Sequence, residues 1–195
     1  MRKSPSDLLI PIQILGEGKK SFSFQESVVA FPVLAEMEER GEGVFVSPVE
    51  IHIDLWRADD IYCGEGTAAT QAELICGRCL EKFLFPLKVE FTLAFSRFSV
   101  DKEDQSGAEE RELAEEDVSL IPFAGDELDL REAVQDQLLM ALPVRPLCRE
   151  ECLGLCPVCG ADRNRESCGC PETAVNPKWA ALAGLRIEDQ ENKES

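Results

Sequence analysis

Histidine and tyrosine are nearly absent from this chain of 195 residues, which contains one of each. A Ser-His-Asp or Cys-His catalytic arrangement would have to use the single histidine, His52, and no GxSxG stretch accompanies it. The segment GEGKKS at 16–21 resembles a phosphate-binding loop, but that motif would require a glycine at the position of Gln13. We therefore expect a protein that is not an enzyme and takes no small-molecule substrate, with His52 on the polar face of a strand.

Long apolar runs are also missing. No segment approaches the roughly 20 apolar residues that a membrane-spanning helix requires. The N-terminal stretch MRKSPSDLLIPIQIL has only a short apolar run, interrupted by Pro11, and is not typical of a secretory signal. We expect a cytoplasmic protein without membrane association, in a compartment where thiols stay reduced and clustered cysteines indicate metal or redox chemistry.

Positive charge is scarce, because 20 lysines and arginines face 38 acidic residues and the formal net charge is -18. Such a charge opposes non-specific coating of nucleic acid. The acids concentrate in 101–117 and in 188–195, which have few apolar residues and are predicted to be solvated. We expect a β-rich domain at 1–100, an acidic linker at 101–120, a helix with a cysteine-rich module at 121–187, and an acidic tail at 188–195.

Alternation of apolar and polar residues predicts strands in the first half of the chain. It is clearest at 49–55 and 87–95, shorter at 8–14, and present at Phe22 and Phe24. Strand candidates also lie around 54–76 and 83–95, and the short connection between them favours antiparallel pairing. A helix is also possible after Pro32.

A helix is predicted from Leu130 to Ala141, with Asp129 and Glu132 at the spacing of a capping box. Its apolar residues, among them Leu138 and Met140, are expected to pack on the sheet. The predicted fold is α+β: an antiparallel sheet or partly closed barrel, a packed amphipathic helix, and a small zinc-binding C-terminal module.

Cysteine, in contrast, is abundant. Nine cysteines are present, an odd number that cannot close completely into disulfides within the chain. Eight of them form four close pairs, CGRC, CREEC, CPVC and CGC, which is the number needed for two tetrahedral four-thiolate zinc sites. The first site is predicted from Cys156, Cys159, Cys168 and Cys170; the second, which would join the sheet to the C-terminal segment, from Cys76, Cys79, Cys148 and Cys152.

Other arrangements of the cysteines stay open. The spacing does not exclude exchanged partners between the sites, a dithiol redox centre, or an iron site like that of rubredoxin. Glycines support the tight turns that such sites need: Gly160 follows the CPVC pair, and Gly169 lies between the last two cysteines. Cys63 has no partner at motif spacing and is expected to be a packed thiol.

Four stretches occur in order between about residues 51 and 185: CGRCLEKFLFPLKVEF, ELDLREAVQDQLLMALPVRPLC, LCREECLGLCPVCGADRN and NPKWAALAGL. Their combination resembles the YceD family, the large ribosomal RNA subunit accumulation proteins. The resemblance implies a non-enzymatic role in the synthesis, processing or stability of 23S ribosomal RNA, and it brings no catalytic residue with it. Many members lack most of the C-terminal cysteines, which implies that zinc stabilises the local fold. The matching positions are Cys76, Cys79, Leu138, Pro143, Pro146, Cys148, Cys152, Cys156 and Cys159.

Contact with RNA would be expected at the C-terminal module, where basic residues meet fewer acids and Trp179 is available for stacking. The candidates are Arg145, Arg149, Arg163, Arg165, Lys178 and Arg186. The alternative is that these are ordinary surface residues and that Trp179 belongs to a core. Two other functions remain: an acidic adaptor that binds a basic ribosomal protein, and a thiol redox or iron electron carrier.

Overall fold

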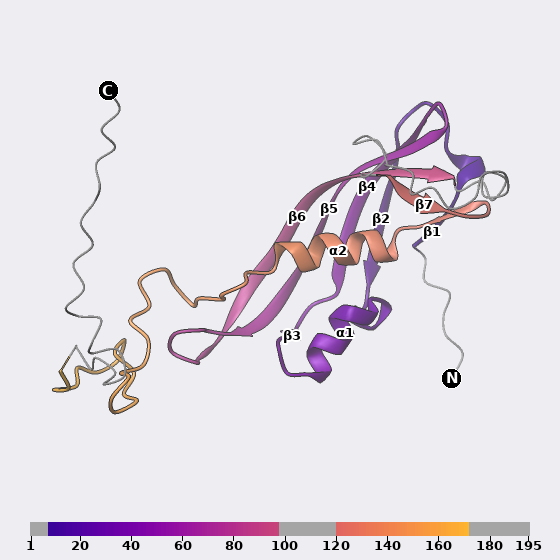
Figure 1. Cartoon of the computed structure of the whole chain (residues 1–195). Helices are drawn as coiled ribbons and strands as arrows, with labels where there is room; N and C mark the ends of the chain where they lie inside the picture. Colours follow the sequence, from indigo (N-terminus) through magenta and orange to yellow (C-terminus); the bar gives the residue numbers. More distant parts are fainter. Residues whose placement is uncertain (1–7, 98–119, 172–195) are drawn as a thin grey trace, which may run out of the picture.

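The computed structural model describes residues 8–97 and 120–171 of the chain (Figure 1). The acidic segments 101–117 and 188–195, together with Lys178, Trp179 and Arg186, lie outside the described residues. In chain order the elements are β1 (Leu9–Pro11), a 3-10 helix (Ile12–Ile14), β2 (Lys20–Glu26), a second 3-10 helix (Val28–Ala30), α1 (Pro32–Glu39), β3 (Val44–Phe45), β4 (Val49–Ala58), β5 (Ile61–Ile75), β6 (Lys82–Arg97), β7 (Ile121–Phe123), β8 (Glu127–Asp129) and α2 (Arg131–Ala141).

The main sheet has six strands in the order β2-β4-β5-β6-β7, with β3 paired to β5 beyond the end of β4. Most pairs are antiparallel as predicted, but β7 runs parallel to β6. The sheet is therefore mixed, and among the described residues it is an open path that ends at β2 and β7. The predicted alternative of a partly closed barrel is therefore not what these strands form. Strands β1 and β8 form a separate two-stranded sheet.

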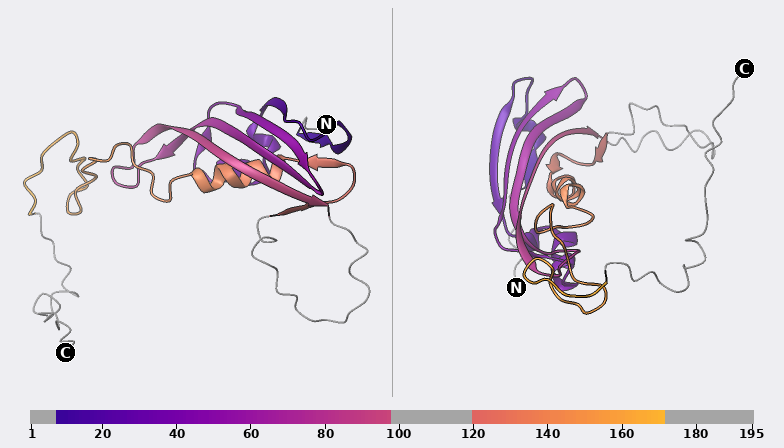
Figure 2. Two further views of the ribbon diagram at one scale, coloured as in Figure 1. Left: turned by 90° about the horizontal axis from the view of Figure 1, so that it is seen from above. Right: turned by 90° about the vertical axis from the view of Figure 1, so that its left-hand side faces the viewer.

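The alternation predicted at 49–55 and 87–95 is confirmed in β4 and β6, where buried residues alternate with more exposed ones. Val49, Ile51, Ile53 and Leu55 of β4 are all buried, while His52 on the opposite face is exposed and its Nδ1 lies 2.9 Å from the Ser23 hydroxyl. The buried face shares one core with Leu34 of α1 and with α2. Both helices lie on this side of the curved sheet (Figure 2), and no helix of the described residues covers the other face.

The helix predicted at 130–141 begins at Arg131, whose backbone N–H donates to Asp129 Oδ1 at 2.9 Å. Leu138 is fully buried as expected, but Met140 is 80% exposed, which corrects its predicted place in the core. It lies two residues beyond Leu138, and that spacing turns a helical side chain away from the shared face. The helix after Pro32 is present as α1.

The strand predicted at 8–14 is shorter than expected. It ends at Pro11, and the next three residues form a 3-10 turn in which the Leu15 N–H donates to the Ile12 carbonyl. Ile14 is exposed as a result. None of the helices in the two described ranges is long and apolar enough to cross a membrane.

The longest feature is the hairpin of β5 and β6, whose strands have 15 and 16 residues. Its tip, residues 76–81, contains the CGRC pair. Helix α2 packs along β6, and the chain that leaves it returns to this tip, where the Gly77 N–H donates to the Pro146 carbonyl at 2.8 Å (Figure 1). The fold thus delivers the later cysteines to the turn that holds the earlier pair.

Candidate metal centres

The structure brings together the same two sets of four cysteines that the spacing predicted. Within the first site (Cys156, Cys159, Cys168, Cys170) and within the second (Cys76, Cys79, Cys148, Cys152), all four sulfurs lie within 4.8 Å of one another. None of the nine cysteines is in a disulfide. The described residues thus show the predicted grouping, without exchange of cysteines between the two sites.

The sulfur spacing of the second site suits a tetrahedral ion. Cys76 Sγ lies 3.8 Å from Cys152 Sγ, and Cys79 Sγ lies 3.8 Å from Cys148 Sγ. Four sulfurs at about 2.3 Å from a zinc ion would be about 3.8 Å apart along each edge of the tetrahedron. Cys76, Cys79 and Cys152 are buried, with Phe83 and Leu147 packed around them. The residues present therefore fit a closed structural site.

The two CxxC turns have the same backbone. In the CGRC turn the Cys76 N–H donates to Glu81 O and the Leu80 N–H donates to Cys76 O; in the CPVC turn the Cys156 N–H donates to Ala161 O and the Gly160 N–H donates to Cys156 O. The residue after each pair is left-handed, with φ of 61° at Leu80 and 76° at Gly160.

The prediction for Gly160 is thus confirmed. Gly169 is not among the residues with positive φ, so the backbone of the CGC turn does not require glycine there.

Two thiols of the second site differ widely in pKa. Burial raises the pKa of Cys76, but the backbone N–H groups of Cys148, Cys79 and Arg78 outweigh burial and lower it to about 6. Loss of hydration and the neighbouring Cys152 thiol raise the pKa of Cys148 to about 12. One sulfur is therefore ionised at neutral pH, whereas another needs a metal ion to displace its proton.

The first site repeats this division nearer the surface. The backbone N–H groups of Cys159 and Val158 lower the pKa of Cys156 to about 6. The Cys159 thiol and loss of hydration raise the pKa of Cys170 to about 12. Cys156 is buried and Cys159 is exposed, with the other two sulfurs in between. This site is more open to solvent than the second.

Arg78 fastens the C-terminal segment to the hairpin tip, a role that the sequence did not reveal. Its Nη1 donates to the carbonyls of Glu150 at 3.0 Å and Cys152 at 2.9 Å. Its own carbonyl accepts the Leu155 N–H at 3.0 Å. At Gly154, which has φ of 70°, a side-chain carbon would lie 2.8 Å from that carbonyl oxygen. The close approach of the two segments therefore depends on glycine at this position.

The basic residues predicted to contact RNA do not form one free patch. Arg145 and Arg163 are exposed. Arg149 donates to Asn164 Oδ1 at 2.8 Å, and Arg165 pairs with Glu81 and Asp162. At least two of the predicted arginines thus help to hold the module together.

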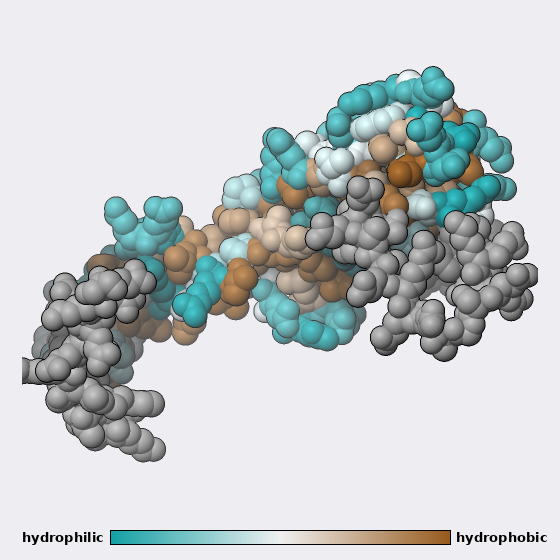
Figure 3. Space-filling model, turned by 45° about the horizontal axis from the view of Figure 1, so that its top comes forward, coloured by the Kyte–Doolittle hydropathy of each residue, from teal (hydrophilic) through white to brown (hydrophobic). Residues whose placement is uncertain are grey.

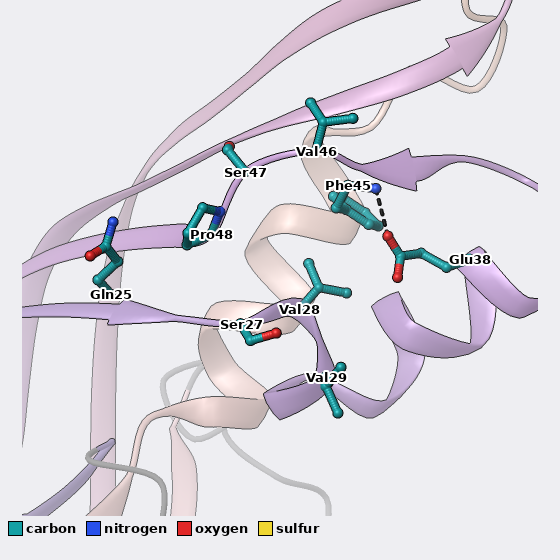
Figure 4. Close-up of a pocket in the computed structure, with 9 residues that line it drawn as sticks. All are labelled: Gln25, Ser27, Val28, Val29, Glu38, Phe45, Val46, Ser47 and Pro48. Atoms are coloured by element: carbon teal, nitrogen blue, oxygen red, sulfur yellow. Dashed lines mark hydrogen bonds between the residues drawn. The ribbon is translucent and has the colours of Figure 1, made fainter.

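The depression drawn in Figure 4 and the ninth cysteine, Cys63, show no arrangement typical of a binding or catalytic site. In the open depression drawn in Figure 4, the Glu38 carboxylate accepts the Phe45 N–H at 2.7 Å and Ser47 Oγ accepts the Gln71 N–H at 2.9 Å. The polar groups there serve the fold. Cys63 is half-buried and lies opposite Trp56 and Ala94 in the sheet register, as expected for a packed thiol.

Fold and clusters together define an α+β protein with two four-cysteine groups suited to metal ions. The family model described as "Large ribosomal RNA subunit accumulation protein YceD" matches residues 64–186, which include both groups, and the chain belongs to this family.

Curated relatives match over varying lengths. An uncharacterized protein of Mycobacterium tuberculosis is 29% identical over 120 residues, which cover 62% of this chain and 53% of the relative. The chloroplastic large ribosomal RNA subunit accumulation protein YCED homolog 1 of Arabidopsis thaliana is 23% identical over 202 residues, covering 93% of this chain and 62% of the relative. This chain therefore spans about half to three-fifths of the length of these relatives. No solved structure matches it.

Proposed function

We propose that this protein promotes the accumulation of large-subunit, 23S ribosomal RNA in the cytoplasm as a binding or assembly factor without catalytic activity. The observation that carries the proposal is the family match over 64–186, which includes all but the first three residues of the long hairpin, α2 and both cysteine groups. A relative that aligns with 93% of the chain is named as a large ribosomal RNA subunit accumulation protein homolog.

Each four-cysteine group, in this proposal, holds one structural zinc ion. When bound, zinc supplies four strong bonds that cross-link the chain. The residues do the rest: the hairpin tip presents Cys76 and Cys79, the segment after α2 presents Cys148 and Cys152, and backbone N–H groups aim at the sulfurs. Elemental analysis of protein purified without added metal should find two zinc ions per chain. Bound iron with visible absorbance, or thiols that cycle reversibly, would support the electron-carrier alternative instead.

The cellular role is tested by the ratio of 23S to 16S ribosomal RNA in the organism that encodes the protein. Removal of the gene should lower the ratio, and the wild-type gene should restore it. Cys76→Ser with Cys79→Ser should restore it poorly, because the module loses its anchor on the hairpin. Cys63→Ser is the matched control, since Cys63 lies outside both groups. An unchanged ratio after gene removal would contradict the proposal.

A second candidate is an adaptor that binds a basic ribosomal protein. Two observations favour it: the net charge is -18, and Arg149 and Arg165 are engaged within the chain. Exposed apolar side chains are also present, among them Leu84, Met140 and Val144. Figure 3 shows hydrophobic residues gathered on the surface where the molecule narrows. Exposed apolar patches mark protein contacts.

The two candidates differ in what the purified protein retains. Direct RNA contact predicts binding at low salt that weakens steeply as salt rises and fails in Arg145→Glu with Arg163→Glu. The adaptor predicts that a basic ribosomal protein co-purifies and survives nuclease treatment. Absence of RNA binding at low salt would eliminate the first candidate.

A further inference from the structure

Asn164 lies in the loop that the first site closes. The loop consists of residues 160–167, and Cys159 and Cys168 flank it. Among its backbone contacts, the Arg165 and Glu166 N–H groups both donate to the Asp162 carbonyl at 3.0 Å, and Asp162 forms a bridge with Leu155. The sulfurs of the first site lie at both ends of this loop, so an ion that joins them would hold the two ends together.

The Asn164 side chain uses its full capacity for hydrogen bonds. Oδ1 accepts the Leu153 N–H at 2.9 Å and Arg149 Nη2 at 2.8 Å. Nδ2 donates to Asp162 Oδ1 at 2.7 Å and to Cys152 Sγ at 3.4 Å. An amide has two acceptor positions and two donor hydrogens, so none is left over. A flipped amide would set its donors against the donors of Leu153 and Arg149, so only one orientation satisfies all four contacts.

The last of these contacts crosses from one site to the other. Cys152 belongs to the second site, whereas Asn164 is carried by the loop of the first. Hydrogen bonds from outside a metal site orient its ligands and tune their donor strength. The Asn164 amide is thus a positioning group for a sulfur that belongs to the neighbouring centre.

We propose that Asn164 couples the two metal sites, so that an ion in the first site increases the affinity of the second site, and the reverse. The inference rests on the proposed occupancy of both sites. An ion in the first site fixes the loop and presents the amide N–H to Cys152. When the first site is empty, the loop becomes ordered only as the second site binds its ion. The conformational entropy lost by the loop then weakens metal binding at the second site. Linkage requires the effect to be equal in both directions.

Contacts other than those of Asn164 also connect the two metal sites. The Leu155 N–H bond to Arg78 O and the pair of Arg165 with Glu81 join the same two segments. The experiment must therefore separate the amide from these contacts. Variants of Asn164 do so, since Leu155, Arg78 and Arg165 keep their own groups.

The test is titration of the full-length, metal-free protein with zinc against a competing chelator, and with cobalt(II) as a spectroscopic probe. Cys168→Ser with Cys170→Ser removes the first site and should weaken zinc binding at the second by about 10-fold to 100-fold. Asn164→Ala should weaken the second site by a similar factor although all eight cysteines remain. Adding Asn164→Ala to the serine variant should have little further effect.

Two controls keep a general loss of structure apart from coupling. Ser167→Ala changes an exposed residue of the same loop and should leave both affinities unchanged. Asn164→Asp keeps the shape but replaces the N–H donor by a carboxylate. It should therefore shift the sulfur-to-cobalt charge-transfer band of the second site, which Ser167→Ala should not.

The outcomes are distinct. Equal zinc affinity of the second site with and without the first would overturn the coupling while leaving both metal sites in place. Fully additive effects of Asn164→Ala and the serine variant would show that the amide acts locally, and would overturn its role as the connection. Absence of bound metal in the wild-type protein would instead contradict the proposed zinc sites themselves.

Discussion

Leu80 is the residue at which the two CxxC turns differ. Its φ is 61°, against 76° for Gly160 at the equivalent position. A left-handed backbone costs an L-residue about 1–2 kcal/mol, and glycine avoids this cost but has more freedom in the unfolded chain. The Leu80 side chain is 63% exposed, so its removal loses little packing. We expect Leu80→Gly to raise the free energy of unfolding by about 0.5–1 kcal/mol.

Urea unfolding of the metal-loaded protein measures this change. The reverse substitution, Gly160→Leu, should destabilise the CPVC turn by about 1–2 kcal/mol. Gly169→Ala is the matched control, because Gly169 lacks a positive φ and an added side-chain carbon meets no atom within 4 Å. A Leu80→Gly protein less stable than wild type would show that the leucine side chain contributes more than its backbone costs.

Cys76 and Cys156, each with a pKa of about 6, predict how proton release on metal binding depends on pH. Both pKa values lie below the ordinary 9.0, so these thiolates stabilise the metal-free fold fully above about pH 9, and that contribution is lost as the pH falls through about 6. At about pH 7.5 each is already ionised, and at about pH 5 each carries a proton that an ion must displace.

We therefore expect each bound ion to release about one more proton at about pH 5 than at about pH 7.5. Calorimetry in buffers of different ionisation enthalpy counts the protons. An equal count at both pH values would contradict the lowered pKa of these two thiols.

The sequence was informative about which thiols meet and silent about what surrounds them. CxxC spacing and the count of eight predicted both groups, because sulfurs in such turns point the same way. Arg78 and Asn164 were missed. Each contacts residues of a separate segment, so its partners follow from the tertiary fold and not from local spacing.

Gln135 connects the two helices. It is 6% exposed in the middle of α2, and its Oε1 accepts the Val33 N–H at 2.9 Å. That N–H belongs to the first turn of α1, whose preceding residue, Phe31, makes no side-chain cap. Loss of a helix cap and of a buried hydrogen bond destabilises a protein by about 1–3 kcal/mol.

Gln135→Ala is therefore expected to lower the free energy of unfolding by that amount, measured by urea titration with metal present. Gln137→Ala, the same change two residues further along α2 at a half-buried position, should have a much smaller effect. Equal effects of the two substitutions would mean that α1 does not depend on this cap.

Long elements with a clear period were predicted, whereas the short strands β3, β7 and β8 were not. Strands β4 and β6 have ten and 16 residues, enough for alternation to define a buried face. Strands β7 and β8 have three residues each, too few to show a period, and the parallel pairing of β7 with β6 depends on a connection outside the described residues. The exposure of Met140 follows from its position two residues beyond Leu138, which turns its side chain away from the face that α2 shares with the sheet.

The molecule has two cores of unequal size. A large apolar cluster joins the sheet to both helices, whereas Cys76, Cys79 and Cys152 form a small one with Phe83 and Leu147 at the hairpin tip. The segment 142–171 has few buried apolar residues apart from its cysteines. In the proposed zinc-bound protein, metal ligation would take the place of hydrophobic burial in this segment, as in small metal-dependent modules.

Removal of the metal should then loosen one end of the molecule and leave the other folded. After chelation we expect residues 142–171 to open, so that trypsin cleaves after Arg149 and Arg163 at least about tenfold faster, because local opening and not global unfolding limits cleavage. Amide protons of β4, β5 and β6 away from the tip should keep their protection against exchange, since their core contains none of the eight paired cysteines.

Mass spectrometry of the tryptic fragments and hydrogen exchange on the same samples measure both effects. Cys63→Ser should behave as wild type before and after chelation, because its thiol lies outside both groups. Loss of protection throughout the sheet after chelation would show that the ions hold the whole fold together and not the C-terminal module alone. Re-addition of zinc should restore resistance at Arg149 and Arg163 without any change in the sheet, which separates reversible loosening of the module from irreversible damage.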